Sequence, residues 1–446
     1  MRSGVEEKME KNLLFDIAKK AKQKGADNVD ILFKESDTIS VRTRMTKLEK
    51  VEQADIIAAK VRISVGKRSA TVSVDNADTL ADDDFLDKVI SAAKNAPEEQ
   101  IQLRSSLTEL CEKIPSMDIL DKTPITAEQL IADAEKCEEI ALSINGITNS
   151  EGAEVSHARS KITLVRDCDF LQQYEKTSNQ ICVVTLAEKN GEMKSDYDFS
   201  QAVYYSDLKS PECVARRAAE RTLKKLGARK IKTCKVPVVF EKNIAGQLLS
   251  SLLGAINGAS IAKGVSFLKD KLSQKVFGEN ISVSDEFNVK RGLRSRPFDA
   301  DGIACRDTNL IENGVLNSFL LNTKYANQLG MKTTGNCSNF SEISPNNISL
   351  KNGKKNFDEL IGGIQHGLFV TEVMGNGLNM VTGNYSQGAA GFWIENGQIA
   401  YPVNEITVAG NFTDMFAHCE AASDLEYITG IDSPTLAMEE MVVGGI

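Results

Sequence analysis

Asn-Gly pairs placed between apolar segments constrain the fold of this 446-residue chain more than any other feature. Both residues of such a pair adopt positive φ angles readily, so the pair fits the two-residue turn that joins antiparallel strands. We predict hairpins at Asn190-Gly191, Asn313-Gly314, Asn352-Gly353 and Asn396-Gly397. Three of the four lie in the glycine-rich second half, which therefore predicts mostly antiparallel β-structure in a curved sheet or barrel.

The first half of the chain predicts helices that alternate with short strands. One helix ends near Gly25, and short strands follow at Val29–Phe33 and Ile39–Thr43. Thr126 and Ser210 precede further helices as N-caps. We therefore expect an α+β protein in which two small α/β units come before the β-rich part.

Domain boundaries follow from changes in composition. Residues 97–124 are irregular and contain prolines, and the glycine-rich texture begins near Val236. The predicted domains are residues 1–115, 116–230 and 231–446. The third domain contains one embedded helix, over Ala245–Asn257.

Charge and cysteine content exclude several classes of protein. The net charge of −9 argues against a nucleic-acid binder, whose contact surface is basic. Nine cysteines without a C-x-x-C pair indicate reduced thiols. The charged amphipathic N-terminal segment is unlike a signal peptide, and no segment reaches the about 18–20 apolar residues that a membrane span needs. We expect a cytoplasmic protein that binds no membrane.

The segment Gly367–Val408 is too rich in glycine for regular strands. Its glycines permit turns and bulges of a β domain, or a groove whose open backbone pairs with a peptide as an added strand. The candidate groove residues are Thr371, Glu372, Gly375, Gly377, Asn379, Gly383, Tyr385 and Gly388.

The same segment closely resembles the TldD/PmbA family, the modulators of DNA gyrase, and is nearer to the PmbA branch, also called TldE. The resemblance rests on several motifs in order: S-R-P-F-D-x-x-G at 295–302, L-I-E-N-G-x-L at 310–316, V-T-E-x-M-G-x-G at 370–377, V-T-G-x-Y-S-x-G-A-A-G-F-W at 381–393 and E-N-G-x-I-A-Y-P-V-x-E-I-T-x-A-G at 395–410. Together with the N-terminal regions, which carry no distinctive motif, the resemblance covers nearly the whole chain.

This resemblance implies a function. The TldD branch of the family carries a zinc-protease helix, H-E-x-x-x-H, and a further cysteine ligand near its C-terminus. The two branches pair as a heterodimer that cleaves small or unfolded peptides. The family is linked to maturation of a gyrase-targeting peptide and to turnover of an antitoxin.

The zinc ligands of that branch are missing from this chain. Aligned on Gly246 and Gly254, the helix has Ser250 and Ser251 at the first histidine and the glutamate, and Ala255 at the second histidine. No His, Asp, Glu or Cys occurs from Gly246 to Ser260, and the segment from Ser433 to Met441 lacks a cysteine. Zinc needs nitrogen, sulfur or carboxylate ligands. We expect no cofactor in this chain and zinc in a TldD-like partner.

The degenerate helix nevertheless has a regular pattern. Leu248, Leu249, Leu252, Leu253 and Ile256 form an apolar stripe. Gly246, Ser250, Gly254 and Gly258 form a second stripe, of small residues. The pattern is typical of a closely packed core helix, and it also fits a helix beside a former active site or a partner interface.

Other catalytic groupings are weak. His157, His366 and His418 are not paired at helical or hairpin spacing, and Cys305 and Cys337 have no histidine nearby in the sequence. Glu372 and Glu405 are candidates for paired carboxylates on adjacent strands.

Three functional hypotheses remain. The leading one is a non-catalytic pseudoenzyme subunit of a heterodimeric zinc metalloprotease that acts on small or unfolded peptides. The second is an autonomous peptidase with a non-zinc or non-standard site, and the third is a binding protein that modulates DNA gyrase. Without its partner the chain is also a candidate homodimer.

Overall fold

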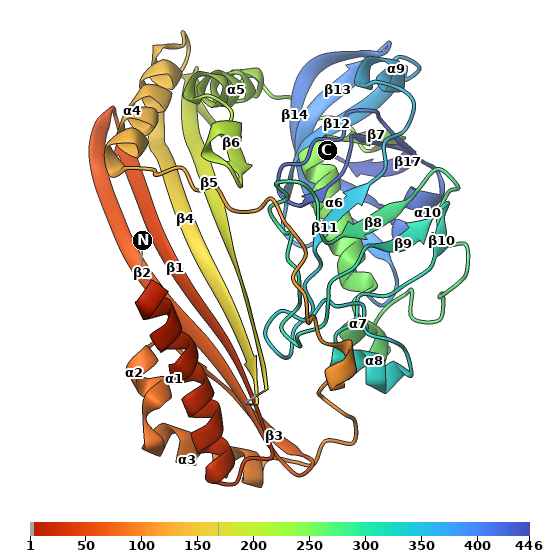
Figure 1. The fold of residues 1–446 in the computed structure, drawn as a ribbon. Helices are drawn as coiled ribbons and strands as arrows, with labels where there is room; N and C mark the ends of the chain where they lie inside the picture. Colours follow the sequence, from red (N-terminus) through yellow and green to blue (C-terminus); the bar gives the residue numbers. More distant parts are fainter. Residues whose placement is uncertain (1–3, 168) are drawn as a thin grey trace.

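A long antiparallel sheet forms one side of the molecule, and a β-rich C-terminal domain forms the other (Figure 1). The computed structural model of the chain describes residues 4–167 and 169–446. Helices and mostly antiparallel strands occur together without a repeating βαβ order, so the predicted α+β class is confirmed.

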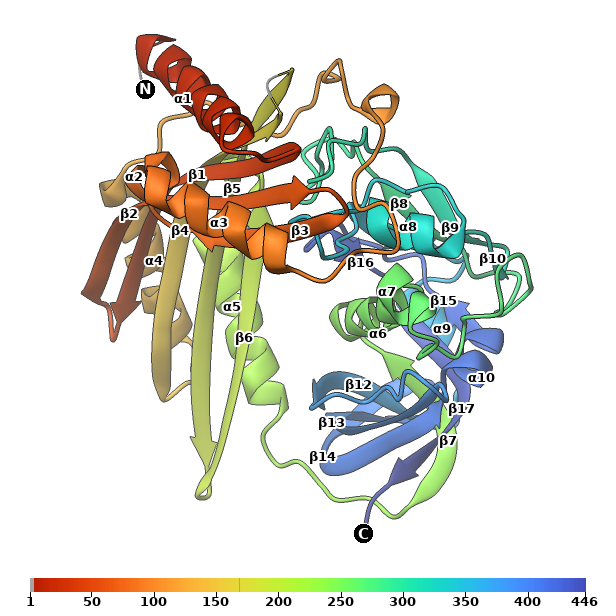
Figure 2. The ribbon, with the colours of Figure 1, turned by 90° about the horizontal axis from the view of Figure 1, so that it is seen from below.

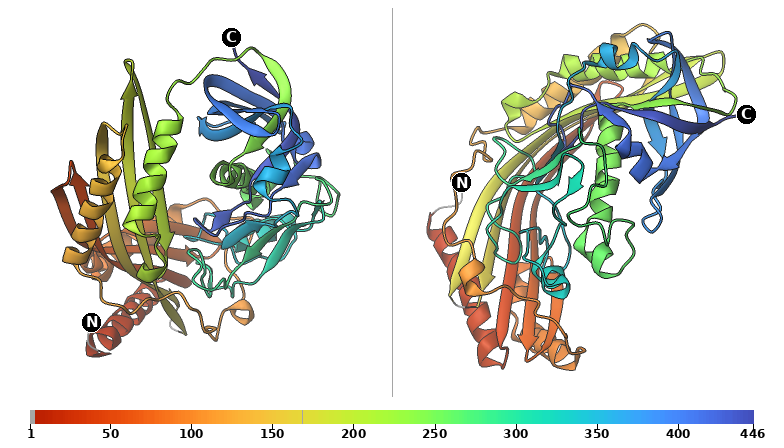
Figure 3. Two further views of the ribbon diagram at one scale, coloured as in Figure 1. Left: turned by 90° about the horizontal axis from the view of Figure 1, so that it is seen from above. Right: turned by 90° about the vertical axis from the view of Figure 1, so that its right-hand side faces the viewer.

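The long sheet has six strands in the order β3-β2-β1-β4-β5-β6. Its strands are β1 (Asn28–Arg44), β2 (Lys47–Val65), β3 (Arg68–Val74), β4 (Asn149–Arg166), β5 (Phe170–Lys189) and β6 (Glu192–Ala202). Strand β1 pairs with β4 along most of its length, so the first two predicted regions contribute to one sheet. Figure 3 shows how its long strands curve.

The prediction of two short strands at Val29–Phe33 and Ile39–Thr43 was wrong, because β1 is continuous through both. The apolar pattern is interrupted between them by polar residues that still pair in the sheet. Ser36, for example, lies opposite Ser160 of β4, and their hydroxyl oxygens are 2.8 Å apart. Polar residues with satisfied hydrogen bonds can occupy a strand that the hydrophobic pattern does not reveal.

Five helices cover one face of the long sheet (Figure 2). They are α1 (Gly4–Gln23), α2 (Ala77–Ala81), α3 (Asp83–Asn95), α4 (Ala127–Ser143) and α5 (Pro211–Lys224). The predicted N-caps are confirmed, since the Thr126 and Ser210 hydroxyls accept hydrogen bonds from the backbone of Gln129 and Cys213. Short 3₁₀ turns occur at Leu107–Glu109 and Tyr205–Asp207.

The C-terminal domain contains a five-stranded sheet and a closed barrel. The sheet order is β10-β9-β8-β11-β16, and the barrel order is β14-β13-β12-β7-β17, closed by pairing of β14 with β17. The barrel strands are β7 (Cys234–Phe240), β12 (His366–Met374), β13 (Asn384–Glu395), β14 (Gln398–Asn411) and β17 (Leu436–Gly444), with β15 (Cys419–Ala421) beside β17. The sheet strands are β8 (Val283–Glu286), β9 (Thr308–Glu312), β10 (Val315–Leu316), β11 (Asn347–Leu350) and β16 (Ile431–Asp432).

The helices of this domain are α6 (Lys242–Ala255), α7 (Gly258–Ala262), α8 (Thr323–Leu329), α9 (Phe357–Ile361) and α10 (Phe412–Ala417). The predicted embedded helix corresponds to α6. No helix in the described part of the chain is both long and apolar enough to cross a membrane.

Three of the four predicted Asn-Gly hairpins are confirmed. Asn190, Asn313 and Asn396 have φ angles of 55°, 50° and 49°, and each is followed by a glycine that also has a positive φ. They join β5 to β6, β9 to β10, and β13 to β14.

The hairpin predicted at Asn352-Gly353 is wrong. This pair leads from β11 toward α9, and the chain beyond it runs parallel to the segment after β15. A Cβ atom on Gly353 would lie 1.8 Å from the carbonyl oxygen of Ala421. Glycine is therefore needed here for close backbone approach instead of a turn.

Candidate functional site

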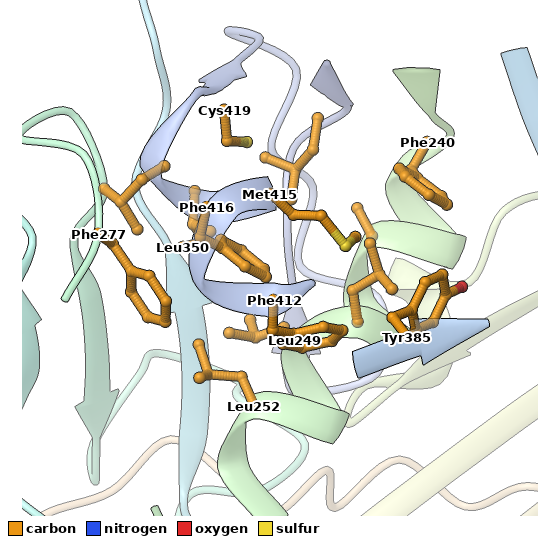
Figure 4. Packing of buried hydrophobic residues seen from close by; sticks show 14 of the residues in the cluster. Phe240, Leu249, Leu252, Phe277, Leu350, Tyr385, Phe412, Met415, Phe416 and Cys419 are labelled. Carbon is orange, nitrogen blue, oxygen red and sulfur yellow. The ribbon is translucent and has the colours of Figure 1, made fainter. Parts of the chain in front are cut away.

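One side of helix α6 forms the interior of the C-terminal domain. All five side chains of the predicted apolar stripe are buried. Figure 4 shows Leu249 and Leu252 packed beside Phe412 and Phe416 of α10, whose ring centroids are 5.4 Å apart. Burial of such side chains contributes about 1.5–3 kcal/mol each, so this face of the helix is retained for stability.

The stripe of small residues allows other segments to approach α6 closely. A Cβ atom on Gly246 would lie 3.1 Å from the carbonyl oxygen of Ile431 in β16. A Cβ on Gly254 would lie 2.6 Å from the Met380 side chain in the glycine-rich loop. A larger residue at Gly246 would press on the Ile431 backbone, whereas at Gly254 the flexible end of the Met380 side chain would have to move aside.

A cavity of about 180 Å³ lies between this side of α6 and the long sheet. Helix α6 contributes Gly246, Gln247 and Ser250 to its wall, and β6 contributes Tyr197 and Phe199. Lys242 and Asn243 at the start of α6 and residues of the segment from Glu426 to Ser433 complete the wall. The cavity therefore joins the two halves of the molecule beside the degenerate helix.

The three degenerate positions are not equivalent in the structure. Ser250 is exposed at the cavity, and its hydroxyl donates to the Gly246 carbonyl at 3.0 Å. Ser251 is partly buried and donates to the Gln247 carbonyl at 3.1 Å, whereas Ala255 is buried. Both hydroxyls satisfy carbonyls one turn back in the helix, as serine often does within helices.

The donor atoms around this cavity do not fit zinc, which takes imidazole, thiolate or free carboxylate ligands. Ser433 supplies only a hydroxyl. The Asp432 carboxylate accepts three backbone N–H groups of residues 428–430 at 2.9–3.0 Å, and Glu426 pairs with Lys242 at 2.6 Å. Within residues 4–167 and 169–446, no three His, Cys, Asp or Glu side chains are grouped to hold a metal ion.

The glycine-rich segment divides into two parts. Gly375, Gly377, Asn379 and Gly383 lie in the loop between β12 and β13. This loop is folded on itself, because the Asn379 side chain accepts hydrogen bonds from the backbone N–H groups of residues 381 and 382, and the Asn379 backbone N–H donates to the Asn384 carbonyl. Its backbone polar groups are therefore partly occupied by the loop itself.

Tyr385 and Gly388 lie on β13 beyond the loop. Tyr385 is buried against Phe412, with ring centroids 5.7 Å apart, and its hydroxyl donates to Gln387 at 2.7 Å. Burial raises the pKa of Tyr385. Tyr385 is thus part of the core that supports the loop, while the proposed groove stays a prediction.

Thr371 and Glu372 line a second cavity, of about 280 Å³. Glu405 lines it too, but it lies on β14, which β13 separates from the β12 strand of Glu372, so the prediction of adjacent strands was wrong. Glu372 pairs with Lys225 at 2.7 Å, and Glu405 pairs with Lys230 at 2.6 Å. The lysine holds the pKa of Glu405 below its usual value, so this group is ionised and paired and is unsuited to acid catalysis.

A buried network of charges connects the long sheet to the C-terminal domain, and sequence reasoning missed it. Arg62 of β2 pairs with Asp30 of β1 at 2.8 Å and with Asp301 at 3.2 Å, and its guanidinium lies 4.6 Å from the centre of the Phe340 ring. Arg166 donates to Asp30 at 3.2 Å. Asp301 lies at an x position within the S-R-P-F-D-x-x-G segment, so this segment helps to fix the two halves together.

Asp299 of the same motif is buried beside Asp301. Burial and the neighbouring Asp301 charge raise the pKa of Asp299 to about 7, against hydrogen bonds from the backbone of Ile303 and Cys337 that lower it. Asp285, buried nearby in β8, has its pKa raised to about 6 by burial. These carboxyl groups are structural and face no cavity described above.

The remaining candidate residues are dispersed. His157 lies on the helix-covered face of the long sheet, His366 begins β12 and His418 follows α10. Cys305 and Cys337 are buried, and burial raises the pKa of both thiols. A raised thiol pKa disfavours the nucleophilic thiolate.

Comparison with known families agrees with these motifs. A family model described as the PmbA/TldA metallopeptidase C-terminal domain matches residues 233–445, and the corresponding central-domain model matches residues 121–226. The chain belongs to the PmbA/TldD metallopeptidase family. It is 30% identical to the metalloprotease PmbA of Escherichia coli O157:H7, over 94% of this chain and 93% of that protein.

A further relative and two solved structures are also similar to this chain. The PmbA homologue of Buchnera aphidicola is 31% identical over 94% of this chain and 93% of its own length. A candidate modulator of DNA gyrase from Bacteroides thetaiotaomicron has the same fold, with a TM-score of 0.90 at 23% identity, covering 98% of this chain and 99% of that one. TldE from Thermococcus kodakarensis has a TM-score of 0.86 at 19% identity, covering 97% and 100%.

Proposed function

We propose that this chain is the zinc-free, non-catalytic subunit of a heterodimeric metallopeptidase that processes or degrades small or unfolded peptides. The observation that carries the proposal is the donor set at the α6 cavity. Hydroxyls and fully bonded carboxylates surround the place where a zinc branch would hold its metal. Membership of a metallopeptidase family then leaves the metal to a TldD-like partner.

The structure supports a role in enclosing the peptide. The cavity at α6 is lined by both halves of the molecule, including the aromatic side chains of Tyr197 and Phe199. These rings supply apolar contacts for side chains of a bound peptide without selecting for a particular sequence. The subunit would thus hold substrate while the partner cleaves it.

One edge of the long sheet is suited to subunit association. Strand β3 pairs with β2 only from Ala59 to Val65, so the segment from Lys47 to Ala58 is an edge within the described sheet. Three apolar side chains along it are exposed, Leu48 by 46%, Val51 by 43% and Ile56 by 52%. Exposed apolar strand edges invite pairing with another chain, and we place the partner subunit here.

Reconstitution tests the proposal. The chain would be purified alone, its zinc measured by atomic spectrometry, and cleavage of an unfolded peptide followed with and without a zinc-binding relative from the same genome. We expect no stoichiometric zinc and no cleavage by this chain alone, and chelator-sensitive cleavage by the complex. Stoichiometric zinc with chelator-sensitive cleavage by the isolated chain would overturn the proposal.

We also propose that this chain works in the cytoplasm. None of the eight described cysteines forms a disulfide, which suits a reducing compartment such as the cytoplasm.

In the absence of the partner, the exposed edge of β2 would allow homodimers. Light scattering at micromolar concentration would detect them.

A further inference from the structure

Helix α6 presents two carboxamide side chains, those of Asn243 and Gln247, to the cavity beside it. Within residues 4–167 and 169–446, neither side chain makes a hydrogen bond to another part of the protein. The hydroxyls of Ser250, Thr429 and Ser433 in the same wall each donate to a backbone carbonyl. The two carboxamides are therefore the side chains of α6 that keep their full hydrogen-bonding capacity for a ligand.

The charged side chains of this cavity compensate one another. The Glu426 carboxylate lies 2.6 Å from the Lys242 ammonium and 3.5 Å from that of Lys209. Asp432 accepts three backbone N–H groups of its own segment. A ligand of this cavity therefore needs no net charge, which suits the interior of a peptide better than its charged ends.

The spacing of the two carboxamides matches an extended peptide. Asn243 and Gln247 are four residues apart, so they lie on the same side of α6, one turn from each other. At about 1.5 Å per residue, the helix separates them by about 6 Å along its axis. In an extended chain the backbone groups of alternate residues turn to the same edge, and these residues are about 6.6 Å apart. One extended peptide can therefore reach both carboxamides with successive groups of one edge.

The chemistry of a carboxamide also matches a peptide backbone. Each carboxamide accepts a hydrogen bond through its oxygen and donates through its nitrogen, so it can bond a peptide N–H and a peptide C=O together. On the side of the cavity formed by the long sheet, the rings of Tyr197 and Phe199 are stacked with centroids 6.1 Å apart. These rings supply an apolar wall against which the peptide lies.

The size of the cavity limits what it can hold. Its volume of about 180 Å³ is below the range of about 300–1,000 Å³ that is typical of drug-sized ligands. Gln247 and Ser250 are exposed, so the cavity is open to solvent beside α6. A short stretch of an extended chain fits these limits, with the rest of the peptide outside.

We propose that Asn243 and Gln247 bind the main chain of an extended peptide, in the interior of its sequence and without regard to its side chains. The inference rests on the proposed function, because it names how the subunit holds its substrate. Recognition through the backbone requires that the peptide has free N–H and C=O groups, which an unfolded chain offers and a folded one has already paired. The ligand class is therefore an unfolded peptide of any sequence.

Peptide binding by the isolated chain tests this site without a cleavage assay. A fluorescent ten-residue unfolded peptide with blocked ends would be titrated with the chain, and so would the same peptide with its six central residues N-methylated. The methyl groups remove every central N–H donor, whichever register the peptide adopts. We expect the unmodified peptide to bind about tenfold more tightly, a factor that two neutral hydrogen bonds readily give.

Variants of the carboxamides separate a direct contact from a structural effect. Asn243→Ala and Gln247→Met remove hydrogen bonding and keep residues that favour helix. Each should reduce the ratio between unmodified and methylated peptide, and the two together should bring it close to one. Such a double-mutant cycle reports the contact itself, because an indirect change of the cavity would weaken both peptides equally.

Asn95→Ala is the matched control, because the Asn95 carboxamide donates to the Ser91 carbonyl within α3, away from the cavity. It should keep the full ratio. A peptide of the same composition in shuffled order, and one with free ends, should bind within about twofold of the first peptide, or about 0.4 kcal/mol.

Several results would overturn the inference. They are absence of binding by the unmodified peptide, equal binding of unmodified and methylated peptide, a full ratio in the double variant, and loss of binding on shuffling. Any of these together with cleavage by the reconstituted complex would leave the proposed function standing. Zinc-dependent cleavage by the isolated chain would overturn the proposed function and leave the ratio unaffected.

Discussion

Two of the places where the long sheet meets the C-terminal domain differ in chemistry. At one, Arg62, Arg166, Asp30 and Asp301 form a buried and bonded network. At the other, Tyr197 of the sheet and Ser250 of α6 face each other across a cavity. The first contact fixes the distance between the two halves, and the second leaves space for a ligand.

This difference separates residues kept for structure from residues available for function. Charges at the closed contact satisfy one another, so removal of one leaves another buried without a partner. Side chains at the open contact bond locally or face solvent, so they can change at small cost. Of the three positions of α6 that the family resemblance aligns with metal ligands, Ser250 lines the cavity at the open contact.

The largest expected effect is at the closed contact. Arg62→Ala should lower the free energy of unfolding by about 3–5 kcal/mol, because it leaves the buried Asp301 without its ion-pair partner and removes one of the arginines that pair with Asp30. Urea unfolding measures this change. Arg159→Ala, which breaks an exposed pair with Glu175, should cost less than about 1 kcal/mol, and equal losses in the two variants would contradict the comparison.

The closed contact should also make stability depend on pH. The pKa of Asp299 is about 7 in the folded chain, against 3.8 as the ordinary value, so the folded state keeps a proton that the unfolded state releases between these limits. Stability should therefore fall as the pH rises from about 4 to about 7, by an amount on the order of 1.4 kcal/mol for each pKa unit.

Asp299→Asn should flatten this dependence, leaving the smaller slope that Asp285 contributes below its pKa of about 6. Denaturant midpoints at a series of pH values provide the measurement. If the variant retains the full slope of the unaltered chain, the group responsible is a different one.

A smaller effect is expected for association at the sheet edge. Val51→Lys combined with Ile56→Lys places two charges on the exposed part of β2 and should weaken binding of the zinc subunit about tenfold, or about 1.4 kcal/mol. Val265→Lys, at an apolar residue that is 41% exposed in the C-terminal domain, serves as the control. Biolayer interferometry compares them, and unchanged affinity in the β2 variant would exclude this edge.

The smallest effect belongs to the open contact. Ser250→Ala should change the free energy of unfolding by no more than about 0.5 kcal/mol, and peptidase activity of the complex should stay within twofold. Leu252→Ala on the buried side of the same helix should cost about 2–5 kcal/mol. A large loss of activity with Ser250→Ala would show that this serine takes part in the reaction.

Much of the fold was predictable from local patterns. The hairpins at Asn190, Asn313 and Asn396 and the caps at Thr126 and Ser210 follow from the conformations that these residues prefer. The prediction of a hairpin at Asn352 was wrong because the next residue, Gly353, allows the backbone to approach Ala421, which is distant in the sequence. A local signal cannot distinguish a turn from a close approach.

The candidate site was only partly predictable. The absence of zinc ligands around Ser250 and the buried leucines of α6 could be read directly from residue types and spacing. The cavity could not, because its walls combine residues 197 and 199 with residues 426–433.

The sequence by itself determined the strand and helix types, the family motifs and the missing metal ligands, because these depend on residue identity and short-range spacing. Only the tertiary structure decided what the motifs do. It assigned Asp301 to a buried ion network and Tyr385 to the core. Burial and long-range pairing determine the charge, solvation and partners of a side chain, and these quantities exist only once distant segments meet.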